Sequence, residues 1–596
     1  MQTFFGILFK KKSIEIISSF LNSISSVYYK KQLNTYHDNC VGYGFEINRR
    51  ASFNQAISLG KDLKILLIGD YQNKRQIEKQ ILIIEHEIIW DKDIYIQVRN
   101  KIRNYLCHIK GIFCLILLDL SDQRICIFSD KHGLIPIYYY HKEGVFVFGS
   151  SLKCVLSYSQ IPRIINSQVI YELFKLGFVI PPSTLINDLK MLMPGEILEF
   201  SKNIVITKVF EEQCSVNYKL SIEDASEEYY KFLVSAILEC ICHVDKCSLL
   251  LSGGIDSAVI ASIINNYSNI NLKCYTIDLN QNNPIEIIEA KKIAELYKID
   301  HHIVDRLSDK MMTYFPKVVW YNEAPIFNGI TEYILCNDIE DNTELVLTGD
   351  GNDLIWGIFS QLPNDFLLQR GLRFSDYYLK VRASLSDNLL DNIVLSPLDK
   401  SFTHEKINMV YSDTGNFFRD SCCTDIKLFG GCGIFNQYNK IRIEPNTHLF
   451  RFPYLDKKLV TLINTIPDTF KIKAQNHEYI RKYLFKYVLE KKNILPNEII
   501  YTKKTWMSSP NAEWLRGGLR VFFEETVFHK NSSIKKFFNI NLIKDIWFLH
   551  LNNKQDYSYF LMMIFTFELW HKMFIESTSM DCKPSVNIRL QDPSGH

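Results

Sequence analysis

Apolar runs alternate with helical patterns over residues 247–351, and this alternation constrains the fold more than any other feature. CSLLL (247–251), LKCYTIDL (272–279) and ELVLTGDG (344–351) have the composition of buried strands. SAVIASIINNY (257–267) and PIEIIEAKKIAELYKI (284–299) have helical apolar spacing. Strands that alternate with helices form a parallel sheet covered on both faces. We therefore predict an α/β domain built on such a sheet.

The first of these strands ends in a turn of Ser252, Gly253 and Gly254, followed by Asp256 and Ser257. Small residues let backbone N–H groups converge, and with the N-terminus of the next helix they form a site for phosphate oxygens. The Lys of a GxxxxGK[ST] loop is absent. A carboxylate beside phosphate requires a cation between them, and Mg²⁺ is suitable. The alternative is a simple connecting turn with Asp256 as a helix-start residue.

Residues 1 to about 205 have a different pattern, in which short β-rich runs are separated by turn residues. The clearest runs are LKILLIGDY (63–71), GIFCLILLDLSDQRICIFSD (111–130), IPIYYY (135–140) and GVFVFGSSLKCVL (144–156). MPGEILEFSKNIVITKVF (193–210) has the pattern of a closing hairpin. Short strands at this spacing predict a layered, mostly antiparallel sheet domain.

The chain of 596 residues is too long for one hydrophobic core. We expect one domain over residues 1–210, a second over 218–576 that starts with a helix near Ser221 and is mainly helical beyond about 360, and a disordered tail over 577–596. A net charge of +2 offers no global attraction for nucleic acid. The sequence has no apolar run long enough for a membrane span, and its scattered cysteines suit buried positions in a reducing cytoplasm.

The complete string SGGIDS resembles the pyrophosphate loop of the asparagine synthetase and β-lactam synthetase superfamily, and TGDGNDLIWG (348–357) resembles a second motif of that superfamily. The resemblance implies ATP and Mg²⁺ as cofactors, with Asp256 and Asp353 as the metal ligands. It places the nucleotide on the loop residues and on Leu251, Ile277, Thr348 and Gly349. It also matches Glu286 to an acidic position beside the loop, although Glu286 also suits an ordinary helix surface.

A third resemblance covers RFPYLDKKLV (451–460), HEYIRKYL (477–484) and LPNEIIYTKKTW (495–506). It implies that Lys504 is the catalytic lysine, which stabilises the charge that builds on the α-phosphate and the tetrahedral carbon. Lys503 is the rival for this role, and Thr502 replaces a usual arginine. Asp350, beside the metal motif, is a candidate for the group that deprotonates the amine.

The N-terminal half resembles the glutamine-hydrolysing domain of the same superfamily, in FSDKHGLIPIYYY (128–140), VFGSSLKCVL (147–156) and IGDYQNKRQI (68–77). Phe5 stands where the family has its nucleophilic cysteine, and Ile68-Gly69-Asp70 replaces the glutamine contact Asn-Gly-Glu. We predict that this domain does not hydrolyse glutamine. The fold class is therefore α/β with two domains: a degenerate amidotransferase-like (Ntn-type) layered β-sheet domain, and a parallel-sheet ATP-pyrophosphatase domain with a helical lobe.

Within the superfamily, NDLIWGIFSQLPNDFLLQRGL (352–372) and IIYTKKTWMSSP (499–510) are most similar to lasso-peptide cyclases. That resemblance implies that an Asp or Glu side chain of a precursor core peptide is adenylated and that the peptide's own α-amine closes a macrolactam. It also implies a leader peptidase as a possible partner. The alternatives are an ammonia-using asparagine synthetase, a β-lactam-type cyclase and a non-catalytic assembly subunit.

Overall fold

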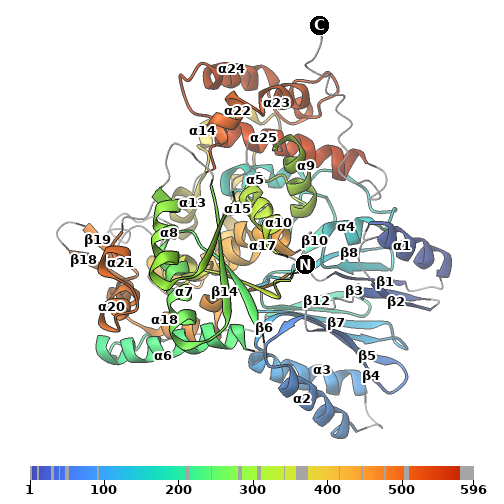
Figure 1. Cartoon of the computed structure of the whole chain (residues 1–596). Coiled ribbons are helices and arrows are strands. Elements are labelled where there is room, and N and C mark those ends of the chain that lie inside the picture. The colour runs from blue at the N-terminus through green and yellow to red at the C-terminus, as the bar shows by residue number, and fades with distance from the viewer. Residues whose placement is uncertain are drawn as a thin grey trace.

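The computed structural model describes residues 3–9, 13–27, 33–38, 40–46, 53–89, 93–208, 215–242, 244–278, 285–304, 311–340, 342–357, 373–414, 416–443, 448–475, 478–502 and 509–577. Apart from Ser577, the predicted tail lies outside these ranges. Figure 1 shows two antiparallel sheets at the lower right, a parallel sheet near the centre, and a group of C-terminal helices at the top.

The N-terminal half contains two six-stranded antiparallel sheets, as its strand pattern predicts. One has the order β10-β8-β9-β1-β3-β2 and the other β12-β11-β7-β6-β5-β4. The strands are β1 (Phe4–Phe9), β2 (Leu33–His37), β3 (Val41–Glu46), β4 (Phe53–Leu59), β5 (Leu63–Tyr71), β6 (Gly111–Asp119), β7 (Arg124–Ser129), β8 (Tyr138–Lys142), β9 (Val145–Gly149), β10 (Leu189–Met191), β11 (Glu196–Phe200) and β12 (Ile204–Lys208). The last two form the closing hairpin expected from the sequence.

Strand β1 shows why these strands are apolar on both faces. Phe4 and Leu8 pack into the core between the two sheets, whereas Phe5, Ile7 and Phe9 face the core on the other side of β1. Successive side chains point to opposite faces of a strand, so burial of both faces requires an uninterrupted apolar run. Helices α1 (Ile14–Val27) and α4 (Leu152–Leu156) cover one outer face, and α2 (Lys74–His86) and α3 (Ile94–Tyr105) cover the other.

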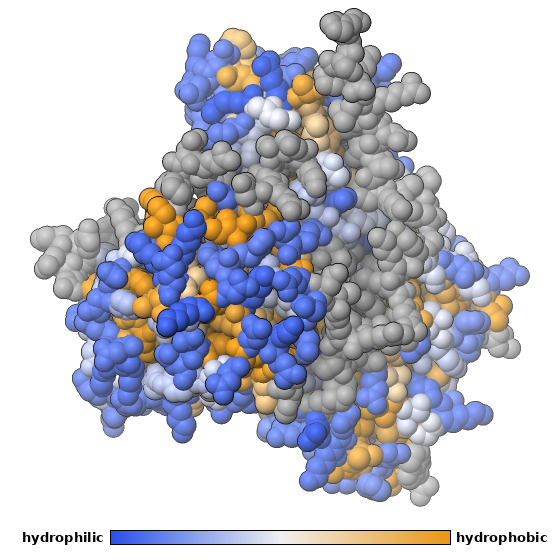
Figure 2. All heavy atoms as spheres, viewed as in Figure 1, coloured by the Kyte–Doolittle hydropathy of each residue, from blue (hydrophilic) through white to orange (hydrophobic). Residues whose placement is uncertain are grey.

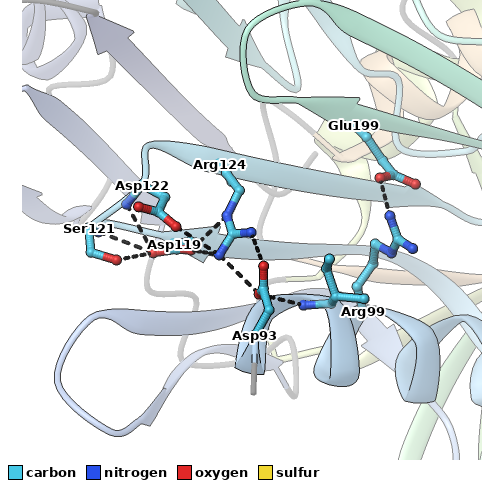
Figure 3. Close-up of polar contacts among 8 residues, drawn as sticks. Asp93, Arg99, Asp119, Ser121, Asp122, Arg124 and Glu199 are labelled. Atoms are coloured by element: carbon cyan, nitrogen blue, oxygen red, sulfur yellow. Dashed lines mark hydrogen bonds and ion pairs between the residues drawn. The ribbon is translucent and has the colours of Figure 1, made fainter. Parts of the chain in front are cut away.

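An ion-pair network fixes α3 to its sheet (Figure 3). The guanidinium of Arg124 contacts Asp93 at 2.5 Å, Asp119 at 2.6 Å and Asp122 at 3.1 Å. Arg99 on α3 reaches Glu199 on β11 at 2.6 Å. A surface cavity of about 500 Å³ opens here. Because Arg124 is already paired with three carboxylates, we interpret the network as structural support.

The second half contains the predicted parallel sheet. Its order is β15-β14-β13-β16-β17, and every neighbouring pair is parallel. The strands are β13 (Lys246–Leu250), β14 (Asn271–Ile277), β15 (Asp300–Val304), β16 (Leu345–Thr348) and β17 (Leu449–Arg451). The sequence patterns predicted β13, β14 and β16 but not the two edge strands. Helices α6 (Ile222–Ile241), α7 (Ile255–Tyr267) and α8 (Ile285–Tyr297) occur where helical spacing was found, and Ser221 caps α6.

Both faces of this sheet are buried. Leu345 and Leu347 of β16 pack into the core that also contains α6 and α7, while Val346 packs on the opposite side. The viewed surface over α7 and α8 mixes hydrophilic with hydrophobic side chains (Figure 2), and Ile285, Ile288 and Leu296 of α8 are exposed.

The rest of the chain is mainly helical, and this agrees with the prediction for the part beyond about residue 360. It comprises α5 (Ile170–Leu176), α9 (Met311–Asn322), α10 (Ile330–Asp338), α11 (Asn352–Ile355), α13 (Phe374–Arg382), α14 (Asp387–Ile393), α15 (Lys400–Val410), α16 (Phe417–Asp425), α17 (Ile434–Ile443), α18 (Lys457–Thr465), α19 (Asp468–Lys471), α20 (Tyr483–Lys491), α21 (Asn497–Ile500), α22 (Asn511–Arg516), α23 (Arg520–Val527), α24 (Ile540–Leu551) and α25 (Ser558–His571), with a hairpin of β18 (Ile472–Gln475) and β19 (Glu478–Arg481). Helix α25 is buried all round. Within the described ranges, no helix combines the length and apolarity needed to cross a membrane.

Candidate active site at the carboxyl end of the parallel sheet

The turn after β13 has the geometry that its small residues predict. Gly253 has φ +72°, and a Cβ atom there would lie 2.5 Å from the backbone oxygen of Glu286. Only glycine therefore fits against the first turn of α8. Ser257, buried at the start of α7, donates to the Gly254 carbonyl at 3.1 Å and lies 3.3 Å from the Ser252 hydroxyl. The loop is thus held open by its own side chains in front of a helix N-terminus, an arrangement suited to phosphate.

The motif after β16 meets this loop. A Cβ atom on Gly349 would lie 3.1 Å from the Cβ of Asp256, so the two segments are in contact. Asn352 donates to the Asp256 carboxylate at 2.6 Å. Asp256 and Asp353, predicted to share a metal ion, are thus brought together.

Lys482 joins these two carboxylates. Its Nζ lies 2.7 Å from Asp256 and 2.6 Å from Asp353, and its side chain is 4% exposed. Burial alone lowers the pKa of Lys482, but the two carboxylates outweigh burial and hold the pKa above its ordinary value. The carboxylates therefore converge on one cationic point, which fits a divalent cation held between them.

Asp256 is less exposed than a typical loop carboxylate. Its side chain is only 16% exposed, and Tyr454 donates to its backbone oxygen at 2.8 Å. Removal of its charge, which would leave Lys482 without one of its two partners, should therefore cost more stability than removal of a free surface carboxylate.

The remaining residues predicted to contact the nucleotide lie at the ends of neighbouring strands. Leu251 follows β13, Ile277 ends β14 and Thr348 ends β16, and all three are buried. The Leu251 carbonyl accepts from the Thr276 hydroxyl at 2.5 Å, and that hydroxyl lies 2.8 Å from His301. In parallel sheets, ligands bind outside these carboxyl ends.

Asp350 lies in the loop after β16, three residues before Asp353. It accepts from the Thr348 hydroxyl at 2.8 Å and is in contact with Arg442. Its side chain is 32% exposed. The structure thus places Asp350 close to the metal motif, as its position in the sequence implies.

Lys504 and its rival Lys503 lie outside the described residues, so the predicted role of Lys504 stays a prediction. Glu286 lies in the first turn of α8, and its backbone borders the loop.

Two cations of the site were missed by the sequence reasoning. HEYIRKYL was recognised as similar to the family, but nothing in its sequence pattern distinguished Lys482 from the other residues of the segment. Arg442 had no signal at all, because its importance depends on where α17 packs.

The positions predicted to replace the nucleophile and the glutamine contact of the amidotransferase domain make structural contacts. Phe5 is completely buried, and its ring packs edge-on against Phe20 at 6.2 Å. Asp70 accepts hydrogen bonds at 2.6 and 3.0 Å from Arg451 of β17, and Arg451 also donates to the Cys240 carbonyl at 2.5 Å. The residue that corresponds to a glutamine contact therefore forms an ion pair between the two halves of the chain.

Comparison with known proteins agrees with this arrangement. The model of the family described as "Asparagine synthase" matches residues 231–572, and that of "Glutamine amidotransferase domain" matches residues 62–211. Asparagine synthetase [glutamine-hydrolyzing] 1 of Bacillus subtilis (strain 168) is 22% identical over 91% of this chain and 92% of that protein. Amidase chyE of Penicillium rubens is 24% identical over 42% of this chain and 40% of that protein. Glutamine PRPP amidotransferase from B. subtilis, a solved structure, is 11% identical and covers 52% of this chain and 67% of that one, with a TM-score of 0.24.

The asparagine synthase family model and the asparagine synthetase relatives indicate an ATP-dependent ligase that forms C–N bonds and releases AMP. The matched segment spans more than half of the chain. The chain belongs to the asparagine synthase family.

Proposed function

We propose that this protein adenylates a carboxylate and joins it to an amine that does not come from glutamine. The observation that supports this proposal most directly is the contrast between the two halves of the chain. The synthetase half retains the loop and paired carboxylates, whereas the amidotransferase-like half has a buried Phe5 and an Asp70–Arg451 ion pair in place of its nucleophile and glutamine contact. Cys114, Cys126 and Cys154 lie within β6, β7 and α4, where their backbone nitrogens are in peptide bonds and cannot act as a free amine base.

In the proposed reaction the loop amides of residues 252–254 and the N-terminus of α7 hold the phosphates of ATP. Asp256 and Asp353 would hold Mg²⁺, which neutralises phosphate charge when bound. Lys482, held by both carboxylates, would contribute a second positive charge on the same side. Lys504 is proposed to stabilise the charge on the α-phosphate and the tetrahedral carbon.

The substrate carboxylate attacks the α-phosphorus of ATP, the bond from that phosphorus to the β-phosphate oxygen breaks, and pyrophosphate leaves. The amine then attacks the acyl carbon of the resulting adenylate. The bond between that carbon and the phosphate oxygen breaks, AMP leaves, and Asp350 is proposed to accept the proton lost by the amine. Asp350 suits this task because Thr348 and Arg442 hold one oxygen of its carboxylate while the side chain remains partly exposed.

For the substrate, we propose a lasso-type precursor core peptide whose own α-amine closes a macrolactam on an Asp or Glu side chain. An amine on the same molecule needs no ammonia source, and intramolecular attack can reach effective molarities of about 10⁵ M or more. A leader peptidase is the expected partner. Buried free thiols such as Cys126 and Cys247 suit a reaction in the reducing cytoplasm.

A second candidate is asparagine formation from ammonia. It is favoured by the almost end-to-end match with the B. subtilis asparagine synthetase. A β-lactam-type cyclase and a non-catalytic assembly subunit are the other outcomes that an experiment must separate.

The deciding experiment is ATP–pyrophosphate exchange with Mg²⁺, in which synthetic linear core peptides are compared with L-aspartate plus ammonium. We expect exchange that requires a peptide and is lost in Asp256→Asn. Asp300→Asn is the matched control, because Asp300 begins β15 and so lies at the amino-terminal end of the parallel strands, opposite the loop.

Exchange with aspartate alone would instead identify the ammonia-using enzyme. Exchange with neither substrate would favour the assembly subunit. Release of glutamate from glutamine would contradict the loss of the amidotransferase activity.

A further inference from the structure

Helix α17 connects the amidotransferase-like half to the active site. Asn436 and Lys440 lie one turn apart on one face of this helix, and both are buried. Asn436 donates to the Gly133 carbonyl at 2.7 Å, and Lys440 donates to the Tyr138 hydroxyl at 2.8 Å. Gly133 and Tyr138 belong to the N-terminal half, so this face of α17 is docked on that half.

Arg442 points elsewhere because it lies two residues further along the helix. It is 3% exposed and contacts Asp350, with Glu332 of α10 at 3.6 Å. Burial alone lowers the pKa of Arg442, but Asp350 and Glu332 outweigh burial and hold the pKa above its ordinary value. A buried, charged guanidinium cannot leave its carboxylates without a large desolvation cost, so Asp350 is held firmly from behind.

Helix α17 itself has little room to move. A Cβ atom on Gly329, at the start of α10, would lie 2.3 Å from the Cδ1 of Ile441. Lys440 also contacts Glu323 at 3.0 Å, and Glu323 accepts from the backbone amides of Leu152 and Lys153 in the N-terminal half. Contacts on both sides therefore set the position of Arg442.

We propose that Arg442 is a positioning residue for amide-bond formation: it holds Asp350 where the attacking amine loses its proton, and α17 makes that position depend on the docked amidotransferase-like domain. This inference rests on the proposed function, in which Asp350 accepts that proton. It gives the N-terminal domain a role although it no longer has the features needed to hydrolyse glutamine.

The test separates adenylation from amide formation in Arg442→Met and Arg442→Lys. The probes are L-aspartate with hydroxylamine and a synthetic linear peptide that has a free α-amine and internal Asp and Glu side chains. In Arg442→Met we expect exchange to stay within about threefold while amide formation falls about 10- to 100-fold, because small misplacements of a reacting group have effects of this size. AMP should then exceed amide product, as water consumes the adenylate.

Two controls distinguish positioning from general damage. Arg442→Lys, which keeps the charge, should recover part of the amide formation. Arg382→Met removes another buried arginine paired with an aspartate, Asp425, and should leave the ratio of amide to AMP unchanged. Equal loss of exchange and amide formation in Arg442→Met would overturn the positioning role.

The dependence on the N-terminal half is tested with the double variant Tyr138→Phe/Asn436→Ala, in the full chain. It should lower the ratio of amide to AMP in the same direction as Arg442→Met. An unchanged ratio would overturn this part of the proposal.

A further measurement does not depend on turnover. The losses in Tm of Asp350→Asn and Arg442→Met should sum to more than the loss in the double variant, because the two residues share one contact. Strictly additive losses would overturn the proposal even if neither probe is a substrate. Absence of exchange in the unaltered protein would instead count against the proposed function.

Discussion

At the scale of single residues, the site is an arrangement of charges around the glycine turn. Lys482 is the residue to which both acidic positions point, and its 4% exposure means that it depends on them for stabilisation. Asp256 in turn loses its cationic partner if Lys482 is removed. The acidic pair and the lysine should therefore be coupled in both binding and stability.

We expect Lys482→Met to weaken ATP binding and to reduce exchange by at least tenfold, because a positive charge beside the phosphates is lost. Stability should fall by about 3 kcal/mol, since two partly buried carboxylates would be left without the cation that lies between them. Added Mg²⁺ should restore part of that stability. The measurements are exchange rates and urea unfolding with and without Mg²⁺. Lys492→Met, which removes a lysine from a partly exposed pair with Glu227, is the control. Unaltered exchange in Lys482→Met would contradict the assigned role.

A second residue-scale prediction concerns Asp130. Burial raises the pKa of Asp130 to about 7, although backbone amides of residues 132–135 lower it. The ordinary value in an unfolded chain is about 4. Between pH 4 and 7 the folded chain therefore binds one more proton than the unfolded chain, and this group makes stability fall as pH rises.

Asp130→Asn cannot ionise, so its stability relative to the parent should improve across that window, by at most about 4 kcal/mol. Urea unfolding at several pH values measures the difference. A constant difference between Asp130→Asn and the parent would show that Asp130 titrates normally.

At the scale of secondary-structure elements, the turn between β13 and α7 is a test of local geometry. Gly253→Ala combines an unfavourable φ of +72° with a clash against the Glu286 carbonyl at 2.5 Å. We expect a loss of stability of about 3 kcal/mol, or a displaced loop that no longer binds ATP.

The adjacent Gly254→Ala is a matched control. Gly254 has φ −80°, and its added Cβ would meet only the Ser252 hydroxyl at 3.3 Å. Its stability loss should stay below about 1 kcal/mol. Thermal unfolding and ATP titration of the two variants compare them directly, and similar losses in both would contradict the assigned backbone constraint.

The same scale shows what sequence patterns could predict. β13, β14 and β16 were predicted because both of their faces are buried, which produces continuous apolar runs. β15 and β17 were missed because they lie at the edges of the sheet: DHHIV carries three polar residues, and LFR is only three residues long. Asp256 and Asp353 were found through motifs, whereas Arg442 reaches the site only through the packing of α17. Such long-range placement has no local pattern.

At the scale of the whole molecule, buried polar contacts fasten the two halves together. The Asp70–Arg451 pair and the Lys153–Glu323 pair both join the two halves and are almost fully buried. Buried charges are costly to separate, so the halves should unfold as one unit. We therefore expect the amidotransferase-like half to support the proposed site through α17, which contacts Gly133 and Tyr138 of that half.

The last prediction tests this coupling at Asp70 and Arg451. Asp70→Asn or Arg451→Met alone should lower the free energy of unfolding by about 3–5 kcal/mol, because each leaves a buried charge without its partner. The double variant should lose less than the sum, and a double-mutant cycle by urea unfolding measures the difference. Lys110→Met is the control: its pair with Glu239 also joins the two halves but is 38% exposed on each side, so its loss should stay below about 1 kcal/mol. If Asp70→Asn costs no more than Lys110→Met, or if the halves unfold in two separate transitions, the ion pair does not hold the domains together and the N-terminal half must be retained for another reason.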